Sequence, residues 1–312
     1  MFNFSIFFPY SCTKNERRNL SEKHCLITGG SSGIGKWAAI EAVKLGANVS
    51  LIARNNDRLI KARDEISTYA ISEKQKIQYF TLDISADYEH TEKTLCEVEK
   101  IMGAVYILIN CAGTAICGTL ENLSIKDAQY MVNLNFYGTL YTIKALLPRM
   151  KERKEGYIVI TASQAALIGI YGLSVYSSTK FALRGLAESL YMEVKPHGIH
   201  VTLAMPPDTD TPGFEQEEKS KPLATSLISE TGGLYKPEVV AEAIIRDTLD
   251  EKFFSTIGFK SGIVTALCSG MSPASSLSEV FLQSSVMGFM RLIAFYFSHS
   301  FLKIVKKCEN IQ

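Results

Sequence analysis

The sequence predicts an α/β fold in which a doubly wound parallel sheet is covered by helices on both faces. Two observations predict it: short apolar runs alternate with longer amphipathic segments, and a glycine-rich turn follows the first apolar run. The composition agrees, because 46% hydrophobic and 21% charged residues among 312 are ordinary values for a globular protein with a substantial core.

Each expected strand is a run of five or six mostly apolar residues that ends at a turn, as buried parallel strands do. In chain order, we expect strands over 24–28, 48–53, 77–82, 105–110, 157–162 and 200–204. The amphipathic segments between them predict helices over 36–45, 57–70, 88–102, 128–150 and 175–194. Because strands and helices alternate, the strands should lie parallel in one sheet.

The N-terminal tail, over 1–22, differs in composition from the single α/β domain that we expect over 23–252. Its first ten residues are apolar but too short to span a bilayer. They also lack the basic start and the small-residue cleavage site of a signal peptide. We therefore expect weak interfacial anchoring from this tail at most.

Residues 253–312 are expected to form an apolar helical extension that associates with a membrane surface. The stretch 280–305 is rich in Phe, Met and Leu, and Lys306 and Lys307 follow it. Arg291 lies in its middle, and a spanning helix would bury that charge at a high cost. An interfacial or re-entrant amphipathic helix fits better, and the alternative is a helix of the core or of a subunit interface.

Charge and cysteine content exclude several classes of partner. The 33 basic and 32 acidic residues give a net charge of +1, so no global field would attract nucleic acid. The seven cysteines form an odd set without a C-x-x-C pair, which argues against a disulfide framework and against a metal site. We expect free thiols in a reducing compartment.

A glycine-rich turn over 28–35 lies between the first expected strand and the first expected helix. Glycine at three of its positions lets the backbone turn tightly and approach a pyrophosphate, while the following helix offers free N–H groups and a favourable dipole. This is the pattern of a Rossmann-type dinucleotide site. We expect the turn to bind a dinucleotide through Gly29, Ser31, Ser32, Gly33, Ile34 and Gly35.

The end of the second expected strand indicates which dinucleotide binds. An acidic residue there would accept a ribose 2′-hydroxyl, but this chain has Arg54, with Arg58 one helical turn further on. Guanidinium suits a 2′-phosphate, so NADPH is the expected cofactor, and the alternative is two solvated arginines. Asp83 is placed to bind the adenine edge. The other expected cofactor-binding residues are Asn110, Ala112 and Gly113 beside the nicotinamide half, together with Tyr176, Lys180 and Thr209.

Ser163, Tyr176 and Lys180 form the strongest chemical constellation. Tyr176 and Lys180 are four residues apart and share one face of a helix, so an ammonium group can lie near the phenol and lower its pKa. Such a phenol can act as a proton donor. Ser163 follows a strand and can donate a hydrogen bond to a substrate carbonyl, and Ala162 makes it the only serine at that place.

These motifs resemble the short-chain dehydrogenase/reductase family, which shows T-G-x-x-x-G-x-G, N-x-A-G and Y-x-x-x-K in this order. The match runs over 22–254. The resemblance implies that Tyr176 protonates a carbonyl oxygen as hydride arrives and that Lys180 binds the nicotinamide ribose. It also implies that Asn135 holds a water of a proton relay, with Asn133 ranked lower.

Within that family the chain is similar to the 3-ketodihydrosphingosine reductases. The runs 28–36, 184–188 and 192–196 carry this resemblance, and 206–214 carries it most narrowly, since the general family usually has Pro-Gly where this chain has Pro206 and Pro207. It implies NADPH-dependent reduction of 3-ketosphinganine, a long-chain keto-lipid, in sphingolipid synthesis. It also implies a place on the endoplasmic reticulum membrane, with the catalytic domain facing the cytosol, and a homo-oligomer.

Two other functions remain open at this point. A membrane-associated hydroxysteroid or retinoid dehydrogenase would share the same core, and only the segment over 206–235 separates the two substrate classes. A non-catalytic dinucleotide-binding scaffold would also keep the fold, but it would not be expected to keep the Ser, Tyr and Lys set.

Overall fold

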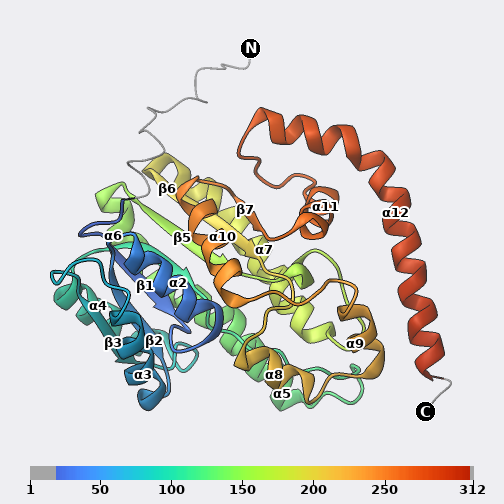
Figure 1. Cartoon of the computed structure of the whole chain (residues 1–312), viewed down its shortest axis with the longest axis horizontal. Helices are drawn as coiled ribbons and strands as arrows, with labels where there is room; N and C mark the ends of the chain where they lie inside the picture. The colour runs from blue at the N-terminus through green and yellow to red at the C-terminus, as the bar shows by residue number, and fades with distance from the viewer. Residues whose placement is uncertain (1–18, 310–312) are drawn as a thin grey trace.

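The computed structural model describes residues 19–309 as seven parallel strands in one sheet with helices on both faces (Figure 1). The strand order is β3-β2-β1-β4-β5-β6-β7. The strands are β1 (His24–Thr28), β2 (Asn48–Ala53), β3 (Ile77–Thr81), β4 (Val105–Asn110), β5 (Gly156–Thr161), β6 (Ile199–Met205) and β7 (Phe254–Thr256). The apolar segment over 1–10, expected to anchor weakly, lies outside the described residues.

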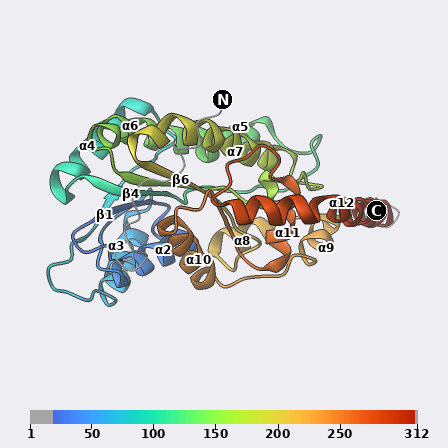
Figure 2. The same cartoon turned by 90° about the horizontal axis from the view of Figure 1, so that it is seen from above.

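The sheet separates two layers of helices (Figure 2). One layer holds α2 (Gly33–Lys44), α3 (Asn56–Ser67) and α10 (Pro237–Leu249). The other holds α4 (Tyr88–Met102), α5 (Ile125–Met131), α6 (Gly138–Arg153) and α7 (Ser174–Val194). The doubly wound parallel sheet predicted from the alternation of elements is therefore confirmed.

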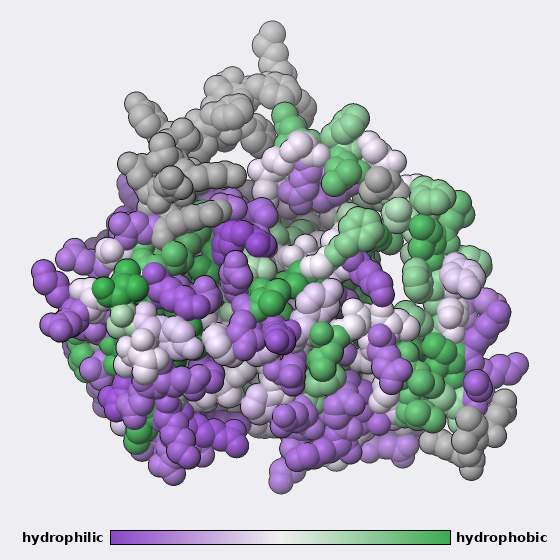
Figure 3. Space-filling model, in the orientation of Figure 1, coloured by the Kyte–Doolittle hydropathy of each residue, from purple (hydrophilic) through white to green (hydrophobic). Residues whose placement is uncertain are grey.

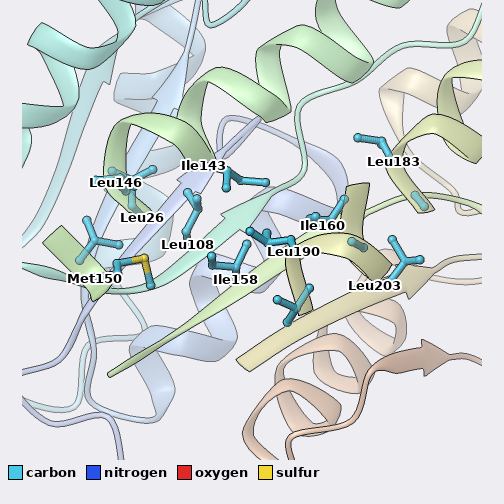
Figure 4. Close-up of a cluster of buried hydrophobic side chains, with 14 of the residues drawn as sticks. Leu26, Leu108, Ile143, Leu146, Met150, Ile158, Ile160, Leu183, Leu190 and Leu203 are labelled. Atoms are coloured by element: carbon cyan, nitrogen blue, oxygen red, sulfur yellow. The ribbon is translucent and has the colours of Figure 1, made fainter. Parts of the chain in front are cut away.

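Both faces of the sheet are buried, which explains why the strands are continuous apolar runs rather than alternating ones. In β1, Leu26 packs into one core and Ile27 into the other, and Ile158 and Val159 of β5 do the same. Figure 4 shows the core on the α6 and α7 side, where the labelled side chains are Leu26, Leu108, Ile143, Leu146, Met150, Ile158, Ile160, Leu183, Leu190 and Leu203.

The helix expected over 128–150 differs from the prediction in one respect that affects the site. It begins earlier, at α5, and ends later, at α6, and the six residues between them form a π-helical segment, η2 (Val132–Tyr137). π-Helical turns inside α-helices are rare and occur often at functional sites. Asn135 lies in this segment.

The chain beyond β6 contains elements that the apolar pattern did not predict. They are α8 (Pro212–Glu218), α9 (Leu223–Ser229), α10 and β7. β7 falls within the range expected to be a helical extension, and it pairs in parallel with β6 through Leu203 and Phe254. Three residues are too few to stand out as an apolar run, and β7 includes Ser255, whose buried hydroxyl donates to Asp247.

Two further helices, α11 (Phe259–Cys268) and α12 (Leu277–Glu309), follow β7. α12 contacts α9 and α11 and extends along one edge of the molecule (Figure 1). Its large apolar side chains are mostly exposed, including Phe281 at 76% and Phe295 at 71%, so it is not a core helix of this chain. Figure 3 shows apolar residues gathered along it.

Within residues 19–309, no single helix is both long and apolar enough to cross a membrane. The two parts of α12, Leu277–Ser285 and Met287–Cys308, meet at a bend of 57° and pass that test only as a pair, by length and composition.

Candidate active site

A cavity of about 680 Å³ opens at the carboxyl ends of β1, β2 and β4. β1 lies between β2 and β4, so the order of the strands reverses at β1. The connections on its two sides run in opposite directions, and such a switch point leaves a crevice for a ligand. Most of the predicted cofactor-binding residues line this cavity: Gly29, Ser31, Ser32, Gly33, Ile34, Gly35, Arg54, Arg58, Asp83, Ala112 and Gly113.

The glycine-rich turn is shaped for close backbone approach. Gly29 has a φ of +68°, and a Cβ atom there would lie 2.8 Å from the backbone nitrogen of Ala112. A Cβ atom on Gly35 would lie 2.5 Å from the carbonyl oxygen of Gly29. Ser32 occupies the N-cap of α2 without a side-chain capping bond, which leaves first-turn N–H groups of the helix for a ligand. These features fit a dinucleotide pyrophosphate.

One end of the cavity carries two cations and one carboxylate. Arg54 and Arg58 are both exposed, and the Arg54 guanidinium carbon lies 5.8 Å from the ring centroid of Tyr130. Asp83 accepts hydrogen bonds from the backbone nitrogen and the hydroxyl of Ser85, at 3.0 and 2.6 Å. Among the described residues that line the cavity, Asp83 is the only acidic one, so this end favours an anionic ligand.

Ser163, Tyr176 and Lys180 come together beside the cavity. Ser163 follows β5 and caps a short 3-10 helix, whereas Tyr176 and Lys180 lie in the first two turns of α7. The Ser163 hydroxyl is placed to hydrogen-bond the Tyr176 phenol, an interaction that lowers the pKa of the phenol. The Lys180 ammonium donates to the carbonyl oxygen of Thr161 at 3.0 Å and lies 5.5 Å from the Tyr176 ring centroid.

The electrostatics of Tyr176 differ from the sequence prediction. Burial raises the pKa of its phenol, the carboxylate of Glu217 raises it further, and the Ser163 hydrogen bond only partly opposes this. The predicted lowering by Lys180 is therefore wrong. The reason is that Lys180 is itself buried, which lowers its own pKa to about 8, and its ammonium is bonded to Thr161.

Asn135 ties the π-helical segment to the loop after β4 and to α7. Its amide nitrogen donates to the carbonyl oxygen of Thr114 at 2.9 Å and to the hydroxyl of Thr179 at 3.0 Å. Its amide oxygen accepts from the Thr114 backbone nitrogen at 2.8 Å. A Cβ atom on Gly113 would lie 3.1 Å from that oxygen and 3.6 Å from the Lys180 ammonium. Asn135 and Lys180 thus both lie next to Gly113.

Besides Ser163, Tyr176, Lys180 and Asn135, which lie next to the cavity, three more residues considered from the sequence do not line it. Asn133 is exposed, so the structure favours Asn135 of the two asparagines. Asn110 is buried at the end of β4, where its amide oxygen accepts from Thr142 at 2.7 Å and its amide nitrogen has no partner. Thr209 is buried and donates to the Pro207 carbonyl oxygen at 2.8 Å.

Several lining residues were missed because they follow the last strand that the sequence predicts. The clearest is Thr211, whose methyl carbon would lie 3.0 Å from a Cβ atom on Gly33. Its hydroxyl accepts from the Phe214 backbone nitrogen and caps α8, which has Pro212 in its first turn. A threonine before proline is a helix-start signal that could have identified it. Gly213, Gln216 and Ser220 lie on the same segment, whereas Tyr130, which was also missed, lies earlier, on α5.

The chain belongs to the short chain dehydrogenase family, whose model matches residues 23–222. A dinucleotide turn, a neighbouring Ser and Tyr pair and a buried Lys at one edge of a parallel sheet are consistent with that membership. The protein is therefore an oxidoreductase of this family, and the family implies a nicotinamide dinucleotide cofactor.

Similar proteins from animals and plants carry related names. A 3-ketodihydrosphingosine reductase of Mus musculus is 44% identical over 285 residues, which are 91% of this chain and 86% of that protein. A 3-dehydrosphinganine reductase of Danio rerio is 43% identical, over 93% and 87% of the two chains. One from Arabidopsis thaliana is 38% identical, over 91% and 85%.

The fold recurs in a solved structure, the crystal structure of levodione reductase. The two chains align with a TM-score of 0.67 at 22% sequence identity, over 74% of this chain and 91% of the other. At this identity the likeness concerns the fold alone.

Proposed function

We propose that this protein reduces 3-ketosphinganine to sphinganine, with NADPH as the hydride donor, in sphingolipid synthesis. The observation that carries the proposal is the identity of 43–44% to proteins named for this reaction, over more than nine-tenths of the chain. The hydroxyl groups of Ser163 and Tyr176, which interact beside the dinucleotide cavity, supply the chemistry that reduction of a ketone requires.

Each residue of the site has its own role in the reaction. A nicotinamide dinucleotide supplies the hydride when bound. The Tyr176 hydroxyl gives its proton to the carbonyl oxygen, and its raised pKa keeps it in the protonated form before the reaction. The Ser163 hydroxyl holds the same oxygen by a hydrogen bond. The buried Lys180 ammonium, next to Gly113, is the group that would hold the nicotinamide ribose.

NADPH, rather than NADH, is supported by the charge at one end of the cavity. Arg54 and Arg58 stand where an acidic residue would bind a free 2′-hydroxyl. Both side chains are exposed, so their guanidinium groups can turn to a 2′-phosphate without breaking an internal ion pair. The two arginines are the residues that would hold the phosphate.

The extension supports membrane association. The exposed apolar side chains of α12, with Lys306 and Lys307 in its last turn, form the kind of surface that docks at a bilayer interface. A substrate with a long alkyl tail partitions into the bilayer, so docking brings the site to it. We place the protein on the endoplasmic reticulum membrane, as a homo-oligomer with its catalytic domain in the cytosol, where free thiols like those described persist.

Turnover by the detergent-solubilised protein tests the substrate and the cofactor together. We expect oxidation of NADPH with 3-ketosphinganine, much slower oxidation of NADH, and little turnover of a 3-ketosteroid. Turnover of the steroid alone would overturn the substrate assignment and would leave the catalytic residues as described. Equal use of NADH would instead overturn the role of the two arginines.

A further inference from the structure

A group of charges around the buried Lys221 lies close enough to Tyr176 to affect the pKa of its phenol. Glu217 of α8 pairs with Lys221, with 3.2 Å between the carboxylate oxygen and the ammonium nitrogen. The Lys221 side chain is only 1% exposed, and that of Glu217 is 15% exposed. Lys221 also pairs with Glu218, and Ser229 bridges Lys221 to the carboxylate of Asp208.

Hydrogen bonds fix this group against the catalytic helix. The Thr225 hydroxyl donates to the carbonyl oxygen of Tyr171 at 2.8 Å, in the loop that leads into α7. The backbone nitrogen of Cys117 donates to the Ser220 hydroxyl at 3.2 Å, and Cys117 itself influences the pKa of Tyr176. Three separate segments of the chain therefore converge around the phenol.

The same turn of α8 borders the dinucleotide cavity. Gln216 and Ser220, which flank Glu217 along the chain, both line that cavity. From the other direction, the Gln164 backbone nitrogen, next to Ser163, donates to the Pro206 carbonyl oxygen at 3.3 Å, two residues before Asp208. The segment that carries Asp208 is thus tied to the residue after Ser163, and the carboxylates of Asp208 and Glu217 both act electrostatically on the Tyr176 phenol.

The charges in this group do not balance. The partly buried carboxylates of Glu217 and Asp208 share one ammonium, that of Lys221, which reaches Asp208 through Ser229, whereas the Glu218 side chain is 44% exposed. Burial raises the pKa of both Asp208 and Glu217, and Lys221 only partly opposes it. A second cation at this place would be attracted, because a partly desolvated carboxylate gains more from an opposite charge than an exposed one does.

The proposed substrate supplies such a cation, because ketosphinganine carries an amino group on the carbon next to its ketone. Building on the proposed function, we propose that Glu217, with Asp208 beside it, binds the protonated amino group next to the ketone and so selects 2-amino ketones. The bound ammonium also offsets the two carboxylates that oppose ionisation of Tyr176, so the correct substrate makes its own proton donor more acidic.

Two ketones that differ only in the amino group test this selection. The probes are 3-ketosphinganine and 1-hydroxyoctadecan-3-one, which keeps the hydroxyl and the tail but lacks the amine. We expect the unaltered protein to favour the amino ketone by about 10- to 100-fold in kcat/KM, the range for a hydrogen bond to a charged group.

The variant Glu217→Gln should lose about 10- to 100-fold in kcat/KM on the amino ketone. On the ketone without the amine, its kcat/KM should not fall. Glu215→Gln is the matched control, because Glu215 lies on the same helix and is exposed, and it should behave as the unaltered protein does with both ketones.

Each other outcome overturns the proposal. Equal use of both ketones by the unaltered protein contradicts the selection, whether or not the Glu217 variant folds, and leaves the proposed function intact. An equal loss on both ketones in Glu217→Gln assigns Glu217 a purely structural role. If neither ketone is turned over, the proposed function itself is contradicted. The selection of 2-amino ketones is then contradicted too, because it rests on that function.

Discussion

Ser163 is placed to hydrogen-bond the Tyr176 phenol and lower its pKa, although the two residues belong to different elements of the fold. Ser163 is held by the end of β5, and Tyr176 by the first turn of α7, which packs on β6. The sheet and the helix therefore aim two hydroxyl groups at one point next to the cavity. A carbonyl oxygen at that point would accept a hydrogen bond from each of the two hydroxyl groups.

Replacing Tyr176 by phenylalanine should remove the proton donor with little change in shape. We expect kcat to fall by about 10²- to 10⁴-fold, the usual contribution of a general acid. NADPH binding, followed by the quenching of protein fluorescence, should persist. Tyr191→Phe on the same helix is the control and should keep its turnover. Full activity in the Tyr176 variant would remove this residue from the mechanism.

The rate of reduction should depend on the charge of Lys180. Burial lowers the pKa of its ammonium to about 8, so the charged form is present below that pH and is lost above it. We expect kcat/KM to decrease as the pH rises through about 8. In Lys180→Arg the cation persists to much higher pH, so this limb of the profile should disappear. Parallel profiles for the two proteins would contradict this assignment.

Arg54 should set the cofactor preference. Arg54→Ala removes a guanidinium at the end of β2, and we expect the KM for NADPH to rise by about 10- to 100-fold while that for NADH changes little. Arg63→Ala, on α3 but paired with Asp64, is the control. A similar rise for both cofactors would show that Arg54 does not distinguish them.

His24 should make the fold sensitive to acid. Its ring is buried between the Ser50 hydroxyl and the Gly103 carbonyl oxygen, and burial lowers its pKa from 6.5 to about 4. The unfolded chain then binds a proton between these pH values that the folded chain does not, so stability decreases as the pH falls from 6.5 to 4. The full loss is about 3 kcal/mol.

Thermal unfolding at several pH values measures this effect. His24→Asn should start from a lower Tm at neutral pH but should lose less on acidification. The exposed His90→Asn should keep the slope of the unaltered protein. An unchanged slope in the His24 variant would assign the acid sensitivity to other groups.

The exposed apolar side of α12 should bind membranes. Phe289 and Leu292 are 65% and 69% exposed, and replacing both by glutamate should weaken flotation with phospholipid vesicles by at least about tenfold. Ser298→Glu on the same helix adds one charge without removing apolar surface and is the control. Equal flotation of the double variant would contradict a docking role for α12.

The sequence predicts the half of the fold that rests on continuous apolar runs. The bounds of β1, β2, β4 and α4 agree with the prediction, because each is a run set off by turn residues or a helix cap. β7 and α8 were not predicted. β7 is only three residues long, and α8 is a short helix whose sequence is mostly polar. Such elements are determined by what they pack against.

In the site, too, some residues could be predicted from local sequence patterns and others could not. Gly29 and Tyr176 could be predicted because a glycine turn and a Y-x-x-x-K spacing are local patterns. Thr211 and Glu217 could not, since their roles depend on how a later segment folds back over the cavity. The prediction that Lys180 lowers the pKa of Tyr176 was wrong for a related reason. The spacing of the two residues does not show that both of them are buried.

Transfer of deuterium tests the central claim most directly. NADPH deuterated at the hydride-donating C4 position is incubated with 3-ketosphinganine and either the unaltered protein or Tyr176→Phe, and the sphinganine formed is analysed by mass spectrometry. The account predicts one deuterium on C3 of the product with the unaltered protein, and almost no product with the variant. Sphinganine without deuterium, or no sphinganine from the unaltered protein, would contradict it.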